Sequence, residues 1–547
     1  MKLTISQAIL KYLEDLGVEY IFGIPSGNTS YIYDSITDSP IKSIVTKHES
    51  GATYSAARYS ELTNKLGVAF LCGGVGVTNS INGIADAYIN KLPMLVISGD
   101  SSTKSKGKGA IQELCTIPIT ESITKYSVNI KNPEDTIKIL DHAVNLALTE
   151  PCGPVHISLP MDIPILETEY IEPNTNYEKI ENDLTAISKA VNVLNKAKKG
   201  LILVGRGAKN VNNEINLLAD KLNFYIATTP QGKGKVLHSS PYYIGNFGFY
   251  SSDFASNYIN DNDVDTVLVL GSSLGESSTQ NFDVDFYTNK TIIQIDHCTK
   301  SLDKKSVENK LAVKYDIKDA LDYLIANIDK KSSRVEPIMD KSTLNKKYIQ
   351  TNNGLSIKEV LDTLPKVLNE NTTYLCDIGE FMNYVYKFLY LPDSSKFIGS
   401  LNYGSMGAII GGATGAAIAK QSKCCAVIVG DGSYYMNGME VLTAKAYNLP
   451  IIYFVINNAK YNYVDQGQSF VFGRSLDGIF FNRLDITKVS EAMGIKSFKV
   501  SNINDLYNLK DTLYNINEPI VVELITDGNE KIGDCDRFKS VKKSVLK

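Results

Sequence analysis

Short hydrophobic runs alternate with amphipathic stretches along most of the chain. Near the N-terminus, apolar residues recur three or four positions apart at Ile9, Leu10, Leu13 and Leu16, which predicts an amphipathic helix. Hydrophobic runs that favour strands follow at residues 20–24, 41–47, 67–71 and 94–98, with helical patterns between them. Because parallel strands need a crossover connection, this alternation predicts parallel βαβ units.

The alternation recurs in three blocks, at residues 1–165, 184–330 and 350–530. Polar segments at about 167–183 and 329–347 read as linkers, and a Lys-rich tail follows at 531–547. In the second block a strand at 200–204 runs into Gly205-Arg206-Gly207, as in Rossmann-like nucleotide sites, and further strands are expected at 266–270 and 291–296. We therefore predict an α/β protein with three doubly wound parallel-sheet domains.

Composition narrows the class of protein and leaves the predicted fold unaltered. The chain has 547 residues, 43% hydrophobic and 21% charged, with a net charge of −4, which gives no reason to expect nucleic acid or a membrane as partner. Its eight cysteines form no C-x-x-C pair, so we expect reduced thiols. The N-terminus lacks a signal-peptide pattern, and no apolar stretch is long enough to span a bilayer. We expect a cytoplasmic protein.

The strongest chemical signal lies in the third block. A strand at 423–429 ends at Gly430-Asp431-Gly432-Ser433; after a short turn, 438–448 has helical composition, and a second strand at 450–456 ends at Asn457-Asn458. Neighbouring parallel strands end at the same sheet edge, so Asp431 and Asn458 should converge there. Their oxygens suit Mg²⁺, and the glycines let backbone N–H groups approach a phosphate.

Gly430-Asp431-Gly432, 24 residues and then Asn457-Asn458 resembles the signature of thiamine-diphosphate-dependent enzymes. The resemblance implies that Asp431, Asn458 and the Lys460 carbonyl hold Mg²⁺. It also implies that Gly432, Ser433 and Asn458 contact thiamine diphosphate.

The first block resembles the pyrimidine-binding domain of the same family. Glu49 follows the strand at 41–47 and by itself would be a helix N-terminal acid. The resemblance implies instead that Glu49 hydrogen-bonds the aminopyrimidine ring and activates the cofactor, with His48 a structural neighbour. Asn79 falls in the matching first-domain core, and Gln112 falls in a loop that would lie near the reacting thiazolium.

Two further segments are similar to cofactor-binding loops of the family. Gly404-Ser405-Met406-Gly407 resembles the segment that bends the cofactor, with Met406 as the apolar wedge and Gly404 holding the pyrimidine. Gly379 and Glu380 lie in a strand-end loop that would touch the diphosphate. Since the family glutamate and metal site come from different subunits, the resemblance implies an obligate homodimer, and we expect a homotetramer.

The chain departs from true acetolactate synthases, its nearest resemblance, at the acceptor side. Ser277 stands where they carry a carboxylate-binding arginine, Met161 replaces a lysine, Gly467 a tryptophan and Ile111 a loop phenylalanine. Losing an arginine removes a bidentate contact to a carboxylate, so the acceptor need not be pyruvate or 2-oxobutyrate. The pyruvate decarboxylases fit worse, because residues 101–109 contain no His and Gly27 replaces their early acid.

We therefore expect a Mg²⁺- and thiamine-diphosphate-dependent carboligase that decarboxylates a 2-oxo acid such as pyruvate and transfers the activated aldehyde to an acceptor. Two alternatives stay open: a 2-oxo acid decarboxylase that releases an aldehyde, and a non-catalytic cofactor-binding or regulatory subunit. At Gly205-Arg206-Gly207 we favour a structural turn over a site for FAD or an adenine nucleotide, because a lone G-x-G is a weak signal.

Overall fold

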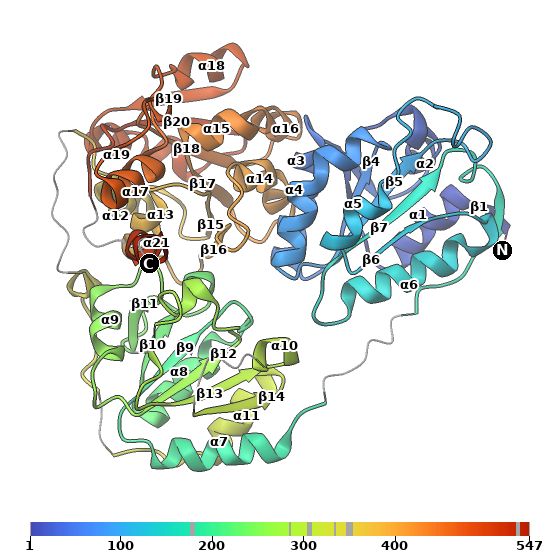
Figure 1. The fold of residues 1–547 in the computed structure, drawn as a ribbon. Helices are drawn as coiled ribbons and strands as arrows, with labels where there is room; N and C mark the ends of the chain where they lie inside the picture. Colours follow the sequence, from blue (N-terminus) through green and yellow to red (C-terminus); the bar gives the residue numbers. More distant parts are fainter. Residues whose placement is uncertain are drawn as a thin grey trace.

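The chain folds into three six-stranded, wholly parallel sheets flanked by helices (Figure 1). The computed structural model describes residues 2–174, 181–283, 286–303, 309–332, 335–345, 354–531 and 536–545. The prediction of an α/β protein with three parallel-sheet domains is confirmed, and the exact domain boundaries stay predictions.

The N-terminal sheet has the order β3-β2-β4-β5-β7-β6. Its strands are β2 (Tyr20–Gly23), β3 (Lys42–Val45), β4 (Gly67–Leu71), β5 (Met94–Asp100), β6 (Tyr126–Asn129) and β7 (Pro154–Pro160). Its longer helices are α1 (Ile5–Asp15), α2 (Ser30–Ile36), α3 (Glu49–Thr63), α4 (Val75–Ile89) and α6 (Thr136–Leu148). The strand order reverses between β2 and β4, which creates a crevice at their carboxyl ends.

The C-terminal sheet repeats this topology, with the order β16-β15-β17-β18-β20-β19. Its strands are β15 (Thr372–Cys376), β16 (Lys396–Gly399), β17 (Cys424–Gly430), β18 (Ile451–Asn457), β19 (Lys496–Val500) and β20 (Ile520–Ile525). Helices α12 (Ile357–Val367), α13 (Met382–Phe388), α14 (Ala408–Ile418), α15 (Asp431–Asn437), α16 (Val441–Ala446) and α17 (Asn462–Phe472) belong to it. Here the order reverses between β15 and β17.

The middle sheet has a different order, β11-β10-β9-β12-β13-β14, which is that of dinucleotide-binding domains. Its strands are β9 (Gly200–Val204), β10 (Tyr225–Thr228), β11 (Tyr243–Asn246), β12 (Thr266–Leu270), β13 (Thr291–Asp296) and β14 (Lys310–Lys314). Helices α7 (Leu184–Lys196), α8 (Asn212–Leu222), α9 (Asp253–Ile259) and α11 (Ile317–Asn327) accompany it. Arg206 and Gly207 follow β9, at the reversal between β9 and β12.

Two local predictions differ from the structure. Where a short turn was expected after Gly430, helix α15 begins at once with Asp431. The segment read as a linker opens with strand β8 (Glu167–Glu169), which pairs antiparallel with β1 (Lys2–Thr4). In both places the surrounding backbone offers hydrogen-bond partners that a short polar sequence does not reveal. Within the C-terminal tail, residues 536–545 form helix α21 (Asp536–Val545), which packs on α17.

The N- and C-terminal domains meet through α3 and α14, which face each other in Figure 1. Helix α14 presents glycines to α3: a Cβ at Gly412 would lie 2.5 Å from Arg58 Cγ, and one at Gly415 only 1.9 Å from the Ser55 carbonyl oxygen. The Ser55 hydroxyl also donates to the Gly411 carbonyl at 3.2 Å. The glycines therefore allow the two helices to approach almost backbone to backbone.

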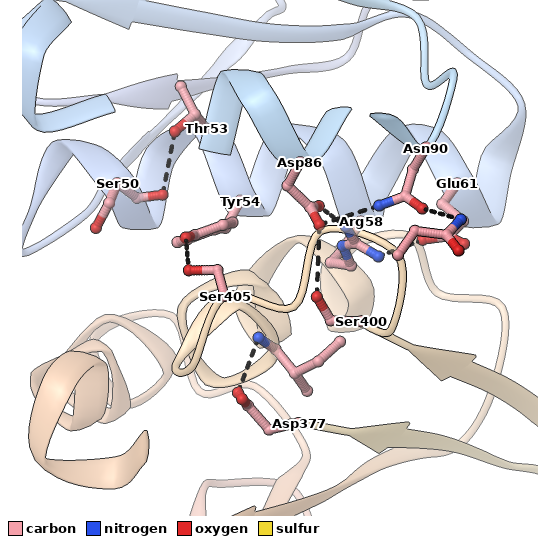
Figure 2. Close-up of polar contacts among 12 residues, drawn as sticks. Ser50, Thr53, Tyr54, Arg58, Glu61, Asp86, Asn90, Asp377, Ser400 and Ser405 are labelled. Carbon is pink, nitrogen blue, oxygen red and sulfur yellow. Dashed lines mark hydrogen bonds and ion pairs between the residues drawn. The ribbon is translucent and has the colours of Figure 1, made fainter. Parts of the chain in front are cut away.

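A buried ionic network continues this interface (Figure 2). Arg58 and Asp86 form an ion pair with side chains only 1% and 0% exposed, and Arg58 also binds Glu61 at 2.5 Å. Asp86 accepts a hydrogen bond from Asn90 at 3.0 Å and a long one from the Ser400 hydroxyl of the C-terminal domain at 3.4 Å. Removing one member would leave a buried charge without its partner.

No helix within the described ranges is both long and apolar enough to cross a bilayer. Seven of the eight cysteines lie in these ranges and all seven are free thiols, while Cys535 falls outside them.

We predict that Arg58→Met lowers the free energy of unfolding by about 3–5 kcal/mol, because Asp86 stays buried without its counter-ion. Urea unfolding followed by circular dichroism measures this loss. Lys65→Met is the matched control, since the Lys65–Glu19 pair has side chains 50% and 57% exposed and should contribute ~1 kcal/mol or less. Equal losses in the two variants would contradict the assignment.

Candidate active site

The predicted metal and diphosphate residues gather where the strand order of the C-terminal sheet reverses. Gly379 and Glu380 lie just after β15, Asp431 follows β17, and Asn458 follows the neighbouring strand β18. In open parallel sheets this crevice is where ligands bind, because the strand order leaves room between the connecting segments.

Asp431 is the buried centre of this group. Its Oδ2 accepts hydrogen bonds from the backbone N–H groups of Asn458 at 3.1 Å and Ala459 at 2.7 Å, and its Oδ1 accepts one from Gly432 at 2.8 Å. Burial raises the pKa of Asp431 to about 6, although these donors oppose the shift. A cation beside the carboxylate would favour its ionised form.

The other two predicted metal ligands lie in the same turn. The Asn458 side-chain oxygen accepts from the Lys460 N–H at 3.2 Å, and the Lys460 carbonyl accepts from the Asn462 N–H at 2.9 Å. Ala459 between them has a φ of 58°, in the left-handed region that non-glycine residues adopt only occasionally. A carboxylate, a carboxamide and a carbonyl are oxygen donors of the kind Mg²⁺ takes, so these residues fit the ion.

The described residues contain no group of three or more His, Cys, Asp or Glu placed to hold a metal. The set Asp431, Asn458 and Lys460 is of another kind, because it has one charged ligand and would rely on phosphate oxygens to complete the octahedron.

Gly432 and Ser433 occupy the first turn of α15. A Cβ at Gly432 would lie 2.6 Å from the Tyr461 ring and 3.3 Å from the Met406 Cε, so the glycine leaves room between these two side chains. The Ser433 hydroxyl donates to the Ile378 carbonyl at 3.1 Å, which links α15 to the loop containing Gly379. The structure thus brings Met406, Gly379 and the start of α15 together.

The segment containing Met406 is fixed from three sides. The Gly407 N–H donates to Asp377 Oδ1 at 3.0 Å, and the Asn437 amide donates to the Gly407 carbonyl at 3.0 Å. The Ser405 hydroxyl lies 2.8 Å from the Tyr54 hydroxyl of α3 (Figure 2). Left-handed φ values of 75° and 82° at Gly404 and Gly407 require glycine at both ends of the segment.

Glu380 is a buried carboxyl group in the same crevice. Its Oε2 accepts from the Asn462 amide at 3.2 Å, while its Oε1 has no hydrogen-bond partner among the described residues. Burial raises the pKa of Glu380 to about 8, which favours the protonated form. An unpaired buried polar atom is costly, and here it adjoins the predicted cofactor site.

The N-terminal domain holds the predicted activating group. Glu49 is the first residue of α3, and its Oε2 accepts a hydrogen bond from the Asn79 amide of α4 at 3.0 Å. His48 caps the helix by accepting from the Ser50 N–H at 3.2 Å, which is the structural role expected of it. Glu49 and Asn79 are therefore brought together.

Gln112 lies on a loop beside the turn after β4. It has a φ of 61°, and a Cβ at Gly74 would lie 2.5 Å from its carbonyl oxygen. The Asn28 amide donates to Gln112 Oε1 at 3.1 Å, and Asn28 Oδ1 accepts from the Gly73 N–H at 3.2 Å. Asn28 holds the predicted site residue Gln112 and was missed by the sequence analysis; its place in the turn after β2 was the available signal.

Glu440 was also missed, and it joins the two domains directly before Glu49. Its Oε1 accepts from the backbone N–H groups of Lys47 at 3.0 Å and His48 at 2.9 Å. A Cβ at Gly51 would lie 2.4 Å from the same oxygen. A carboxylate of the C-terminal domain thus fixes the strand end that carries Glu49.

The site residues form two groups within one chain. Glu49, Asn79 and Gln112 belong to the N-terminal domain, whereas Asp431 and its neighbours belong to the C-terminal domain. Among the described residues no hydrogen bond joins Glu49 or Gln112 to the second group. Glu440 and Asn437 contact the start of α3 from the end of α15 opposite to Asp431.

The four residues that differ from acetolactate synthases at the predicted acceptor side lie in separate places in the structure. Ser277 lines a cavity of about 180 Å³ at the order reversal of the middle sheet, where Gly207 and Gly271 pack against each other. Ile111 is 92% exposed, and Gly467 faces the Phe538 ring of α21. The Met161 N–H donates to the Asp100 carbonyl at 3.2 Å.

Comparison with known proteins agrees with this arrangement. Residues 3–119 match the thiamine pyrophosphate enzyme N-terminal TPP binding domain, 187–324 the central domain, and 377–524 the C-terminal TPP binding domain. The chain therefore belongs to the thiamine pyrophosphate enzyme family, and it is a thiamine-diphosphate-dependent enzyme.

Its relatives include acetolactate synthase large subunits over nearly the full length. The protein of Lactococcus lactis subsp. lactis is 30% identical, with 96% of this chain and 93% of the relative covered. The protein of Buchnera aphidicola subsp. Schizaphis graminum is 30% identical, with 92% of this chain and 90% of the relative covered. The acetolactate synthase isozyme 3 large subunit of Escherichia coli is 26% identical, with 96% of this chain and 95% of the relative covered.

We predict that Glu380→Gln stabilises the cofactor-free protein at alkaline pH. With a native pKa of about 8 against an ordinary value of 4.5, the native chain binds a proton that the unfolded chain has lost, so stability falls as pH rises through this window. At pH 8.5 the variant should be more stable by ~1 kcal/mol or more, with little difference at pH 4. Urea midpoints against pH measure this, and exposed Glu518→Gln should leave the pH slope unchanged.

Proposed function

We propose that the chain is a Mg²⁺- and thiamine-diphosphate-dependent carboligase that decarboxylates a 2-oxo acid such as pyruvate and transfers the activated aldehyde to an acceptor. The observation that carries the proposal is the convergence of Asp431 and Asn458 in one crevice of a thiamine pyrophosphate enzyme. The full-length similarity to acetolactate synthase large subunits supports ligation rather than simple release of an aldehyde.

Each side chain has a defined task in this proposal. Asp431, Asn458 and the Lys460 carbonyl would hold Mg²⁺, and Gly432, Ser433 and Gly379 would admit the diphosphate. When bound, thiamine diphosphate supplies the carbon nucleophile and the electron sink. Glu49 would share a proton with a ring nitrogen of the aminopyrimidine, and Asn79 fixes the orientation of its carboxylate.

The two groups of site residues also support a homodimer. Within one chain, Ser50 near the start of α3 contacts Asn437, at the end of α15 that is opposite to Asp431. We propose that Glu49 of one subunit completes the site built on Asp431 of the other subunit. The minimum active unit is then a dimer, either alone or within a tetramer. We also propose that the protein is cytoplasmic.

Other functions have less support. A decarboxylase would need proton donors near the reacting carbon, and residues 101–109 contain no histidine. A non-catalytic subunit would not need the Glu49–Asn79 pair or the buried Asp431. Because Ser277 stands in place of an arginine that would bind the carboxylate of the acceptor, we also propose that the acceptor is not pyruvate or 2-oxobutyrate. We propose no FAD or nucleotide at Gly205-Arg206-Gly207, where the cavity of about 180 Å³ is smaller than most small-molecule sites.

We predict that Glu49→Gln lowers kcat by ~100-fold or more while thiamine diphosphate still binds, because the amide cannot exchange the proton. Asp431→Asn should instead weaken binding of cofactor and Mg²⁺, measured by isothermal titration calorimetry. Glu134→Gln, the same change on the exposed surface of the N-terminal domain, is the control for both. Unchanged activity in Glu49→Gln would remove Glu49 from the mechanism.

The ligation step is tested with ¹³C-labelled pyruvate, Mg²⁺ and thiamine diphosphate, with and without a panel of aldehyde and 2-oxo acid acceptors. Nuclear magnetic resonance should show a new carbon–carbon bond with at least one acceptor. Carbon dioxide release at the same rate with every acceptor, with free acetaldehyde as product, would favour the decarboxylase. In the Ser277→Arg variant, the rate of product formation with carboxylate acceptors should rise by roughly tenfold.

A further inference from the structure

The middle and N-terminal domains meet at the turn that follows β13. Within this turn the Cys298 N–H donates to Asp296 Oδ1 at 2.8 Å, which fixes the shape of the turn. His297 Nε2 lies 3.1 Å from Glu150 Oε2 of the N-terminal domain. The next residue, Cys298, lies against Lys91, which follows α4 of the same domain. Two successive side chains of one turn therefore contact the N-terminal domain.

The contact between Lys91 and Cys298 pairs an ammonium group with a thiol. Lys91 Nζ lies 3.4 Å from Cys298 Sγ and 3.4 Å from the Ser301 hydroxyl oxygen. Among the residues that the structure describes, Lys91 has no acidic partner, and these two groups are its only hydrogen-bond partners. A hydroxyl and a thiol are neutral, so the ammonium group gains a negative partner only when the thiol ionises.

Cys298 differs from the other buried and half-buried cysteines in the ease with which its thiol ionises. Burial opposes ionisation of Cys298, but the Ser301 hydroxyl and Lys91 outweigh burial and hold the pKa of this thiol below its ordinary value. Burial instead raises the pKa of five other thiols, those of Cys72, Cys152, Cys376, Cys424 and Cys425. The thiolate is the form that reacts with oxidants, so Cys298 is the most reactive of these six.

A small molecule has a route to this pair. Cys298 itself is only 4% exposed. Lys91 and Ser301, its two polar neighbours, line the cavity of about 180 Å³ at the order reversal of the middle sheet. About 15 Å³ of such volume holds one water molecule, so hydrogen peroxide, which is little larger, fits as well. The low exposure of the sulfur disfavours a bulky reagent such as a glutathione disulfide.

We infer that Lys91 and Cys298 form a covalent modification site, at which hydrogen peroxide oxidises the sulfur and the Lys91 amine then captures it in a sulfur–nitrogen bond. A sulfenic acid can condense with a neighbouring nitrogen to a sulfenamide. Here the nitrogen is already in contact with the sulfur, and the bond would join two domains. The inference does not depend on the proposed function.

The reaction consumes one hydrogen peroxide and releases two water molecules. The Cys298 thiolate attacks one peroxide oxygen, the O–O bond breaks, and the hydroxide that leaves takes up the thiol proton. Lys91 Nζ, in its uncharged form, then attacks the sulfur of the sulfenic acid. The S–O bond breaks, and the hydroxyl group leaves as water with one proton of the amine. The sulfur is oxidised by two electrons, and the peroxide is reduced by the same two.

The test treats the full chain with hydrogen peroxide, removes the excess with catalase and maps the peptides by mass spectrometry after digestion with chymotrypsin. The peptides of Lys91 and Cys298 should appear joined, with a mass two hydrogen atoms below their sum, and dithiothreitol should separate them. The link should also raise Tm, because it encloses residues 92–297 and restricts the unfolded chain. Dithiothreitol should reverse this rise.

Two variants of Lys91 separate its charge from its amine. Lys91→Gln removes both, so it should abolish the joined peptide and slow the oxidation of Cys298 by about tenfold. Lys91→Arg keeps the charge but lacks a nucleophilic amine, so Cys298 should oxidise at nearly the wild-type rate without a joined peptide. The rate is measured as the loss of Cys298 that can be alkylated in denaturant. Lys65→Gln, with a side chain 50% exposed on the same domain, is the matched control and should behave as the wild type.

Circular dichroism shows that each variant is folded before peroxide is added, and the peptide map of the wild type decides the question even if a variant fails to fold. Absence of the joined peptide from the oxidised wild type, whether or not Cys298 has reacted, would overturn the inference. A joined peptide that persists in Lys91→Arg would overturn it as well, because the nitrogen would then come from another residue.

Discussion

The close packing of α3 on α14 is the contact on which the rest of the structure depends. Glycines on α14 let it approach α3 to distances that any side chain would forbid. The two helices adjoin different parts of the proposed site: α3 begins with Glu49, and α14 directly follows the segment of Met406. Because the helices are fixed against each other, the orientation of both segments is fixed as well.

Polar contacts complete this interface at both ends of α3. At its start, Glu440 accepts two backbone N–H groups next to Glu49, which ties the end of strand β3 to the C-terminal domain. Further along α3, the Arg58–Asp86 pair and its neighbours reach the middle and C-terminal domains. Buried ionic groups add little net stability over apolar packing, but removing one partner leaves a buried charge uncompensated.

The two flanking domains share one strand order, yet in the proposed function they provide different chemistry at the same position in the fold. In both, the residues assigned to the site by our proposal or in contact with them gather near the order reversal: Asn28 and the Gly73–Gly74 turn in one, Asp431 and Glu380 in the other. The sheet edge supplies the crevice in each case, and the side chains of the turns decide its use. The middle domain, with its different order, contributes Arg206, whose guanidinium group donates to the Asn90 carbonyl of the N-terminal domain.

The sequence by itself indicated nine of the strands, the three parallel-sheet domains and the approach of Asp431 to Asn458, because hydrophobic runs and strand-end motifs are local and directional. It also determined the family, since the two-part motif is specific in spacing. Only the tertiary structure decided the contacts of Glu440 and Asn28 and the start of α15 at Asp431. These depend on which distant backbone groups meet after folding, and no local pattern encodes the partner of a buried carboxylate.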